Sequence, residues 1–409
     1  MNDSARIASL FAYNSCLAIF LTYGVFFNKV AAEFGEHALS TSSVFATFAL
    51  TYSLSSLLMG ALMVRLGAKK TIFFGGALMA LGLGVSSLAP SIPFLILSYG
   101  VIAGGGSGSM WLPTSYAVFS TFTPSRIRSV TGVVSAGTAF GSLFFAPFEA
   151  LMITLLGWRP TFVVLGILVL ALASAAALGS EVAERGNVAP QEELSSNEDK
   201  KPTTENGEMK PNFGKSIGKA VVRKDFWSLY VYYMLGNAFA RTIVMIFIVP
   251  MLEAKGFGLL ASSIAPALIG SGSMLGRILT YVRGLSEETI SALSFILQGA
   301  SSLAMLYTGD LYLIYVLSFI FGVGYGGYIP QFALIVRKRF GMNYYSGVFG
   351  LLLTSFGIGA STGPLFGGYE LTVTGGYSAM FYIASFVSIL IGAHQIITKN
   401  RRTRLVEEI

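Results

Sequence analysis

Two arginines, Arg277 and Arg241, lie inside long apolar stretches of this sequence. Arg277 belongs to 265–281 and Arg241 to 226–250. An arginine within a membrane costs roughly 2.5–3.5 kcal/mol on insertion scales, so it marks a functional site that faces the protein interior or a watery cavity. The guanidinium stays charged and binds a carboxylate through two parallel hydrogen bonds. We expect no acidic residue deep in an apolar segment, so the missing anion is a candidate substrate.

Each arginine also has a structural interpretation. Arg277 lies toward the cytoplasmic end of its apolar stretch, where it can snorkel or bond to backbone carbonyls. Arg241 follows 236–240, a stretch that suits a bent helix near a cavity. The two arginines either hold the two ends of a small dicarboxylate or serve in turn in different states. The sequence leaves these alternatives open.

The composition places the chain among membrane proteins. Hydrophobic residues make up 54% of its 409 residues, charged residues 11%, and the mean hydropathy is +0.68, which is too apolar for a soluble protein. Apolar runs recur near the ~20 residues that a helix needs to cross a bilayer. The alternating segments of about ten residues that are typical of a transmembrane barrel are absent. The sequence therefore predicts an all-α membrane protein.

Residue types that carry other chemistry are scarce. The one cysteine is Cys16, and His37 and His394 lie far apart, so we expect neither a disulfide nor a metal site. The glycine cluster 104–108 lacks the Lys-Ser/Thr ending of a phosphate-binding loop. No nucleophile and base form a recognisable set. We therefore expect no enzymatic activity and no cofactor.

Twelve spanning helices are predicted, six on each side of one long polar segment. They cover approximately 8–31, 42–64, 70–89, 92–118, 128–151, 159–180, 226–250, 258–282, 288–307, 311–335, 344–368 and 376–398. We expect an N-terminal six-helix half (1–180), a cytoplasmic linker loop (181–224) and a C-terminal six-helix half with a short cytoplasmic tail (225–409). The charged composition of the linker predicts partial disorder.

Most of the 27 lysines and arginines fall on one side of this topology. By the positive-inside rule, both termini and the linker then lie in the cytoplasm. The same placement explains the net charge of +7 without nucleic-acid binding. Short loops favour a multi-pass protein of a prokaryotic plasma (inner) membrane, and we expect a monomer in the lipid bilayer.

The two halves repeat each other in sequence. Gly60 recurs at Gly276 and Pro113 at Pro330. Parallel six-helix halves related by an axis along the membrane normal are typical of secondary transporters, which hold their substrate between the halves near the midplane. The repeat therefore predicts two pseudo-symmetric halves that work by alternating access.

The stretch 60–70, between predicted helices 2 and 3, resembles the cytoplasmic signature of the major facilitator superfamily, with Val64 in place of its usual acidic residue. The resemblance implies the major facilitator fold and a gating loop. The expected residues of that loop are Gly60, Arg65, Gly67 and Lys69.

A longer set of motifs is similar to the monocarboxylate transporter family and its oxalate/formate antiporter relatives. It covers nearly the whole chain outside the linker: 23–27, 104–108, Pro113, 126–132, 157–159, 276–277, 322–326, Pro330, Gly363 with Pro364, and 375–377. The resemblance implies that Arg277 matches the helix 8 arginine that binds the substrate carboxylate. The aspartate that animal members carry four residues earlier is Ser273 here, and their helix 1 lysine is absent.

Substrate contacts are expected from helices 1, 4, 7 and 10 and from helix 8. The predicted substrate-binding residues are Arg277, Arg241, Tyr23, Tyr116, Asn237 and Tyr328. Glu149 and Glu370 lie at the outer ends of the equivalent helices 5 and 11. They either carry protons as partly buried carboxyl groups or lie exposed at the rim.

These observations predict a secondary active transporter of a small organic carboxylate, such as lactate or pyruvate. The expected partners are that anion, the lipid bilayer and, in one alternative, protons, because transport is either proton-linked or an anion exchange. Three other functions stay open: an oxalate/formate-type dicarboxylate antiporter, a drug or neutral-solute carrier of the same fold, and a transporter-like receptor that uses the 181–224 loop.

Overall fold

The computed structural model describes residues 2–180, 218, 221–280, 285–340 and 342–407, and every regular element in these ranges is helical. Eleven helical stretches of the described residues are long and apolar enough to span a membrane. Helix α16 (Met342–Thr374) adds a helix of 33 residues. The expected all-α membrane architecture is confirmed. Most of the predicted linker falls outside the described residues, as does Gly284, which corresponds to Gly67 in the sequence repeat.

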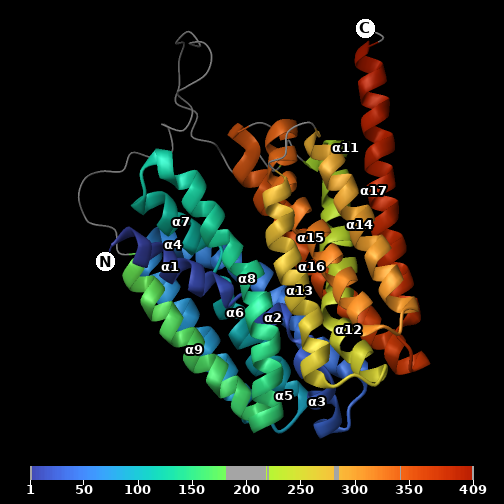
Figure 1. The fold of residues 1–409 in the computed structure, drawn as a ribbon. Coiled ribbons are helices and arrows are strands. Elements are labelled where there is room, and N and C mark those ends of the chain that lie inside the picture. Colours follow the sequence, from blue (N-terminus) through green and yellow to red (C-terminus); the bar gives the residue numbers. More distant parts are fainter. Residues whose placement is uncertain (1, 181–217, 219–220, 281–284, 341, 408–409) are drawn as a thin grey trace.

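The N-terminal helices form one bundle (Figure 1). Its elements are α1 (Asp3–Ser15), α2 (Ala18–Leu21), α3 (Gly24–Phe34), α4 (Ala38–Ser86), α5 (Ile92–Leu95), the π-helical η1 (Ile96–Ala103), α6 (Gly104–Ser107), α7 (Leu112–Thr121), α8 (Pro124–Leu156) and α9 (Trp158–Gly179). Together α1, α2 and α3 make the first predicted spanning helix, and α5 to α7 make the fourth. Predicted helices 2 and 3 are joined in α4 across Gly67, whose φ of 79° suits glycine alone.

The C-terminal helices form a second bundle beside the first. Its elements are α11 (Lys224–Val231), the π-helical η3 (Tyr232–Ala240), α12 (Arg241–Ala254), α13 (Leu259–Leu279), α14 (Glu287–Tyr307), α15 (Leu311–Phe340), α16 and α17 (Ser378–Glu407). The first three are consecutive and make the seventh predicted helix.

Glycines let helices within each bundle pack backbone against backbone. A Cβ atom added to Gly326 of α15 would lie 2.0 Å from the carbonyl oxygen of Ser273 on α13. In the other bundle, a Cβ atom added to Gly106 of α6 would lie 2.3 Å from the amide nitrogen of Met79 on α4. The repeated glycines of the sequence motifs therefore serve close helix contacts, as small residues commonly do in membrane proteins.

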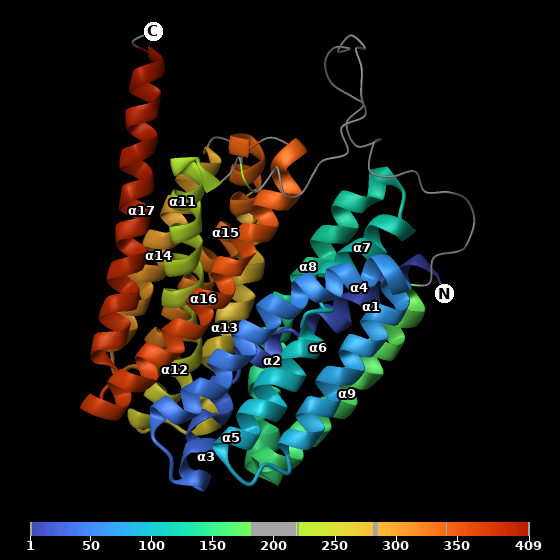
Figure 2. The same ribbon diagram turned by 180° about the vertical axis from the view of Figure 1, so that it is seen from behind.

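The main contacts between the two bundles join α3 with α12, α4 with α16, and α8 with α13, and α2 also contacts α12. The amide of Asn28 on α3 donates to Glu253 Oε2 on α12 at 2.8 Å, and the backbone N–H of Leu39 on α4 donates to Thr372 Oγ1 on α16 at 3.1 Å. Figures 1 and 2 show the bundles converging at the end where α3 and α5 lie and spreading toward the end that carries both termini. The closed end of the molecule is therefore the α3 end.

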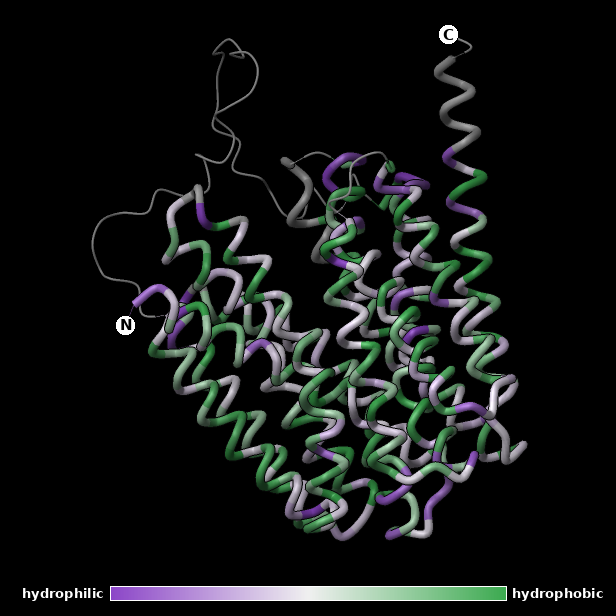
Figure 3. The backbone as a smooth tube through the Cα atoms, viewed as in Figure 1, coloured by the Kyte–Doolittle hydropathy of each residue, from purple (hydrophilic) through white to green (hydrophobic). Residues whose placement is uncertain are grey.

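Hydrophobic residues run along the helices, and hydrophilic residues gather toward the helix ends (Figure 3). Ion pairs follow this distribution. Arg126 pairs with Asp3 at 2.6 Å near the termini, and Arg159 pairs with Glu33 at 2.8 Å at the opposite end. The apolar band between the two ends suits helices that face lipid.

Candidate functional site

A cavity lies between the two bundles. It encloses about 950 Å³ when the open space at its mouth is counted. Its lining residues are Leu17, Phe20, Leu21, Tyr52, Ser53, Ser56, Trp111, Leu112, Thr138, Tyr233, Asn237, Arg241, Arg277, Tyr325, Ile329, Phe332, Leu353 and Phe356. Both halves contribute, so the cavity lies where a transporter of two repeats holds its substrate.

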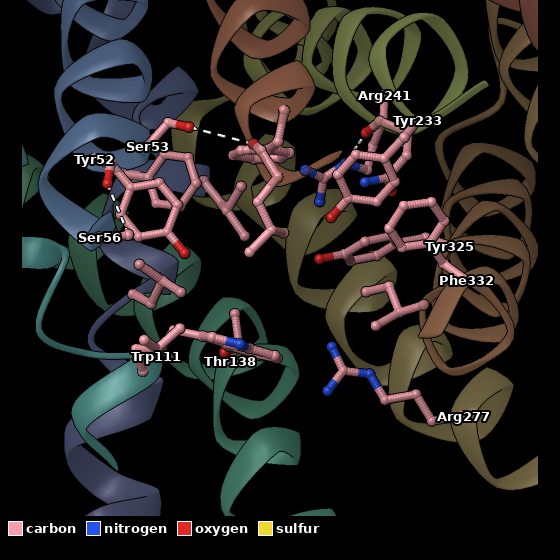
Figure 4. A pocket seen from close by; sticks show the side chains of 18 residues that line it. Tyr52, Ser53, Ser56, Trp111, Thr138, Tyr233, Arg241, Arg277, Tyr325 and Phe332 are labelled. Carbon is pink, nitrogen blue, oxygen red and sulfur yellow. Dashed lines mark hydrogen bonds between the residues drawn. The ribbon is translucent and has the colours of Figure 1, made fainter. Parts of the chain in front are cut away.

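The π-helical segment η3 leads directly into Arg241. Short π-helical turns within α-helices are frequent at functional sites. Tyr233 and Asn237 of η3 and Arg241 at the start of α12 all line the cavity. The Nε atom of Arg241 donates to the backbone carbonyl of Asn237 at 2.7 Å, which holds the side chain along the helix. Figure 4 shows its guanidinium group directed into the cavity.

Arg277 reaches the same cavity from α13. Its Nη1 atom donates at 2.6 Å to the backbone carbonyl of Ser135, which belongs to α8 of the other half. Its Nε atom is buried without a hydrogen-bond partner. Arg277 therefore does bond to a backbone carbonyl, as the structural interpretation expected. Its Nε–H group is still free to donate a hydrogen bond to a ligand.

Tyr325 of α15 lies between the two guanidinium groups (Figure 4). The Cζ atom of Arg241 is 4.5 Å from the centroid of the Tyr325 ring, a cation–π distance, and 5.4 Å from that of Phe356. Tyr325 also interacts with Arg277 through its side chain. One aromatic residue thus contacts both cations.

The N-terminal half faces the arginines with neutral polar and aromatic side chains. Tyr52, Ser53 and Ser56 come from α4, Trp111 precedes α7, and Thr138 comes from α8. The Thr138 hydroxyl donates to Asn14 Oδ1 at 2.6 Å, and the Asn14 amide donates to the Met110 carbonyl at 3.0 Å.

Among the described residues that line the cavity, the charged ones are two arginines and none is acidic. Arg241 is only 3% exposed. Two cations beside a partly aromatic surface favour an anion, and a planar carboxylate matches the hydrogen-bond geometry of a guanidinium. Among the described lining residues, no nucleophile lies with a base beside it.

The sequence profile of the Major Facilitator Superfamily matches residues 9–284, which is more than half of the chain. The chain belongs to this superfamily. It is therefore a multi-pass integral membrane protein and a secondary transporter, and the superfamily is one of transporters, not enzymes.

Within the superfamily, the chain is distantly similar to monocarboxylate transporters across most of its length. It is 24% identical to monocarboxylate transporter 9 of Gallus gallus, over 94% of this chain and 90% of that protein. It is 22% identical to monocarboxylate transporter 12 of Homo sapiens, over 96% of this chain and 79% of that protein. A shorter match, 28% identical to human monocarboxylate transporter 7, covers 42% of this chain and spans only 33% of that protein.

A solved transporter structure has the same fold as this chain over nearly its whole length. A bacterial homolog of the human lysosomal transporter Spinster, in an inward-facing and unoccupied conformation, matches with a TM-score of 0.70 at 15% identity. The match covers 97% of this chain and 95% of that one. The likeness shows the fold, and the predicted major facilitator fold is confirmed.

The predicted substrate-binding residues divide into two groups. Arg277, Arg241 and Asn237 line one cavity. Tyr23, Tyr116 and Tyr328 do not: Tyr23 is buried within the N-terminal bundle and donates to the Thr41 carbonyl at 3.4 Å, and Tyr116 is 47% exposed on α7. Tyr328 packs behind the cavity against Phe295, with ring centroids 4.4 Å apart.

Sequence reasoning missed most of the aromatic lining. Tyr52, Trp111, Tyr233 and Tyr325 reach the cavity. Tyr233 has one sequence signal, because it precedes Asn237 and Arg241 at intervals of four residues and so shares their side of the helix. The others carry no comparable signal, because tyrosine and tryptophan are also ordinary packing and interfacial residues in membrane proteins.

Both predicted carboxyl groups are buried. Glu149 is 0% exposed and Glu370 is 8% exposed, so the alternative of an exposed rim position is wrong for both. The expectation that no acidic residue lies deep in an apolar segment is also wrong, because Glu149 is fully enclosed. Neither residue lines the cavity, so neither neutralises its arginines.

The predicted gating-loop residues lie around the kink of α4. Gly67 forms the kink, and Arg65 and Lys69 are exposed on either side of it. A Cβ atom added to Gly60 would lie 2.9 Å from Leu112 of α7. Arg65, Gly67 and Lys69 therefore lie at the turn between two spanning helices, whereas Gly60 lies within the first of these helices, beside the cavity-lining Leu112.

Proposed function

We propose that this superfamily member transports a small organic carboxylate by alternating access. The observation that carries the proposal is the pair Arg241 and Arg277, which direct their guanidinium groups into one cavity without an acidic residue in its described lining. A carboxylate there offsets charge that is otherwise uncompensated. Because a ligand shifts a conformational equilibrium only through differential affinity, an anion that gathers both arginines favours closure of the halves around it.

The similarity to monocarboxylate transporters supports a monocarboxylate as the first substrate to test. The aromatic side chains Tyr52, Trp111, Tyr233 and Phe356 in the cavity lining offer an apolar surface for a larger group on the acid. We therefore propose lactate or pyruvate as minimal substrates, with larger 2-oxo or aryl acids in the same site.

We also propose that both termini lie in the cytoplasm of a plasma membrane, with halves of 1–180 and 225–409 joined by the 181–224 loop. The basic residues of short loops, such as Arg65 and Lys69, support this orientation. In that orientation, the end at which the bundles spread apart is the cytoplasmic end. The conformation described here then has its halves closed toward the outside.

The test is uptake into proteoliposomes. Purified protein should take up labelled lactate or pyruvate, and the matching neutral amides, which keep the size but lose the charge, should not compete. Arg277→Ala should abolish uptake while the protein remains inserted in the membrane. Competition by the amides as strong as that by the acids, or normal uptake by a well-folded Arg277→Ala variant, would refute the proposal and favour a neutral-solute carrier.

A second candidate substrate is a small dicarboxylate such as oxalate. Two guanidinium groups in one cavity suit a ligand with two anionic ends. One end would then replace the Ser135 carbonyl as the partner of Arg277, and the other would replace the Asn237 carbonyl as the partner of Arg241. Labelled oxalate that enters only when unlabelled anion is trapped inside would identify an exchanger. Acceleration of monocarboxylate uptake by an imposed inward proton gradient would identify a proton-linked carrier.

A further inference from the structure

Glu149 is a buried carboxyl group that the proposed substrate site does not use. It lies about two turns before the end of α8 at Leu156. Its side chain is fully enclosed, and neither carboxyl oxygen has a hydrogen-bond partner. An ionised carboxylate in such a place is an unpaired buried charge, which is strongly unfavourable. The carboxyl group therefore holds a proton in this conformation.

The polar neighbours of Glu149 are hydroxyl groups that carry no charge. The hydroxyl of Thr22 faces the carboxyl group. That hydroxyl also lies within hydrogen-bond distance of the carbonyl oxygens of Ala18 at 3.0 Å and Ile19 at 3.3 Å, so its one proton is shared among several acceptors. Tyr99 of η1 is the titratable group nearby, and its hydroxyl donates to the Ile19 carbonyl at 3.5 Å. These neutral hydroxyl groups do not compensate the charge of a carboxylate at Glu149.

Basic side chains on the described helices that pack against α8 either have other partners or lie far from Glu149. Arg159 of α9 pairs with Glu33 of α3. Lys29 of α3 is exposed at the closed end, and Arg277 of α13 bonds to Ser135, four turns away along α8. Asp3 of α1 pairs with Arg126 near the start of α8, at the end of that helix away from Glu149. Tyr23, beside the break, donates to the Thr41 carbonyl.

Glu149 lies directly behind a contact between the two halves. Thr22 occupies the break between α2 and α3, where its φ of −94° and ψ of 6° interrupt the helix. Two residues later, Gly24 touches the other half: a Cβ atom there would lie 2.4 Å from the Ile246 carbonyl oxygen. The helix that carries Glu149 also packs on α13, where a Cβ atom at Gly270 would lie 2.6 Å from the Ala139 carbonyl oxygen. These contacts must separate for the cavity to open at the α3 end.

We propose that Glu149 is a proton-binding site that must be filled before the two halves can close at the α3 end. A proton from water on that side binds the carboxylate while the contact is open, and the neutral carboxyl group is enclosed when α3 and α12 meet. Closure then becomes less favourable by about tenfold for each pH unit above the pKa that Glu149 has in the open conformation, as one-proton linkage requires. The link to transport rate rests on the proposed function; the link to closure does not.

The test measures closure of the two halves at the α3 end, and it needs no substrate. Ser42 of α4 is fully buried against α16, where a Cβ atom at Gly368 would lie 2.3 Å from its hydroxyl oxygen, and that hydroxyl has no partner. Ser42→Cys is nearly isosteric, and the chain's one cysteine is removed by Cys16→Ser. A membrane-impermeant maleimide should label Ser42→Cys faster as pH rises, because deprotonation of Glu149 opens the α4–α16 contact together with the α3–α12 contact.

Glu149→Gln and Glu149→Leu keep the size of the side chain but cannot ionise. The labelling rate of either variant should follow only the pH dependence of the thiol itself. At the alkaline end of the pH range, the variants should be labelled at least tenfold more slowly than the parent. Glu370→Gln is the matched control: Glu370 Oε1 accepts hydrogen bonds from Thr374 Oγ1 at 3.1 Å and from the Ala379 amide at 3.3 Å, whereas both carboxyl oxygens of Glu149 lack a partner. The control should behave like the parent.

Equal labelling profiles for the parent and both Glu149 variants would overturn the proposal, as would a pH-dependent opening that Glu370→Gln alone abolishes. A protein that transports no carboxylate but still shows Glu149-dependent labelling would refute the proposed function and leave the proton site standing.

Discussion

The Nη1 atom of Arg277 on α13 donates a 2.6 Å hydrogen bond to the backbone carbonyl of Ser135 on α8, so one side chain of the cavity also joins the two halves. A carboxylate is a stronger acceptor for a guanidinium than a neutral carbonyl, because it carries the opposite charge and can accept two parallel hydrogen bonds. An anion that enters the cavity therefore competes with Ser135 for the same donor. Substrate binding and the α8–α13 contact are linked through this guanidinium.

Replacing Arg277 with lysine should weaken carboxylate binding even though the substitution keeps the positive charge. Lysine loses the planar fork that reaches an anion and the Ser135 carbonyl together. A hydrogen bond to a charged group contributes about 1.5–3 kcal/mol, so KM for carboxylate uptake should rise by about tenfold to a hundredfold. Uptake kinetics in proteoliposomes measure this change. Arg126→Lys, in an exposed ion pair with Asp3, should leave KM unchanged.

An unchanged KM in Arg277→Lys with normal expression would show that Arg277 acts on the α8–α13 contact alone. A lower maximal rate at constant KM would lead to the same conclusion.

Replacing Arg241 with lysine should also reduce affinity, for a different reason. The guanidinium packs on the Tyr325 and Phe356 rings and bonds to the Asn237 carbonyl. Loss of this cation–π geometry costs about 0.5–2 kcal/mol, which predicts a two- to thirtyfold weaker Kd by calorimetric titration of purified protein. Arg159→Lys is the matched control, because Arg159 lies 4.5 Å from the Trp158 ring, away from the cavity. Equal losses in both variants would contradict a binding role for Arg241.

Tyr325→Phe and Tyr328→Phe form a pair that separates the cavity from the packing behind it. Tyr325 lines the cavity and interacts with both arginines, so loss of its hydroxyl should weaken carboxylate binding about two- to tenfold. The buried Tyr328 hydroxyl has no partner, so its removal should leave binding unchanged and leave stability unchanged or slightly higher. Calorimetric titration and thermal unfolding of both variants measure the two effects. The reverse pattern would place the site against Tyr328.

This pair also shows where prediction from sequence stops. Arg277, Arg241 and Asn237 stand out because charge and amide groups are costly in an apolar segment. Tyr325 and Tyr328 are about 60° apart around one helix, and α15 is apolar on all sides, so its pattern does not define which side faces the cavity. The interruptions of the first spanning helix at Cys16 and Thr22 likewise turn Tyr23 away from the cavity, and nothing in the local sequence marks them.

Whether Glu149 is buried depends on where the helix that carries it ends. The predicted fifth helix stops at 151, which places Glu149 at the rim, whereas α8 continues to Leu156 and carries the carboxyl group about two turns inward. The overall fold was predictable because its signals are long apolar runs and repeated glycines. The rotation and exact ends of each helix depend on tertiary contacts, and these decide which side chains meet.

A substitution at Gly24 should shift the conformational equilibrium without touching the cavity lining. In Gly24→Ala the new Cβ atom would lie 2.4 Å from the Ile246 carbonyl oxygen, and a backbone atom cannot rotate away as a side chain can. Overpacking of this kind costs about 1–3 kcal/mol, which favours separation of α3 and α12 by about five- to 150-fold. Maleimide labelling of Ser42→Cys in the Cys16→Ser background should rise, and uptake should slow because the closed end no longer forms readily. Gly84→Ala is the control, because a Cβ atom at Gly84 meets nothing within 4 Å. If Gly24→Ala is labelled no faster than Gly84→Ala, the α3–α12 contact does not hold the halves together, and closure at this end must depend on the α4–α16 and α8–α13 contacts instead.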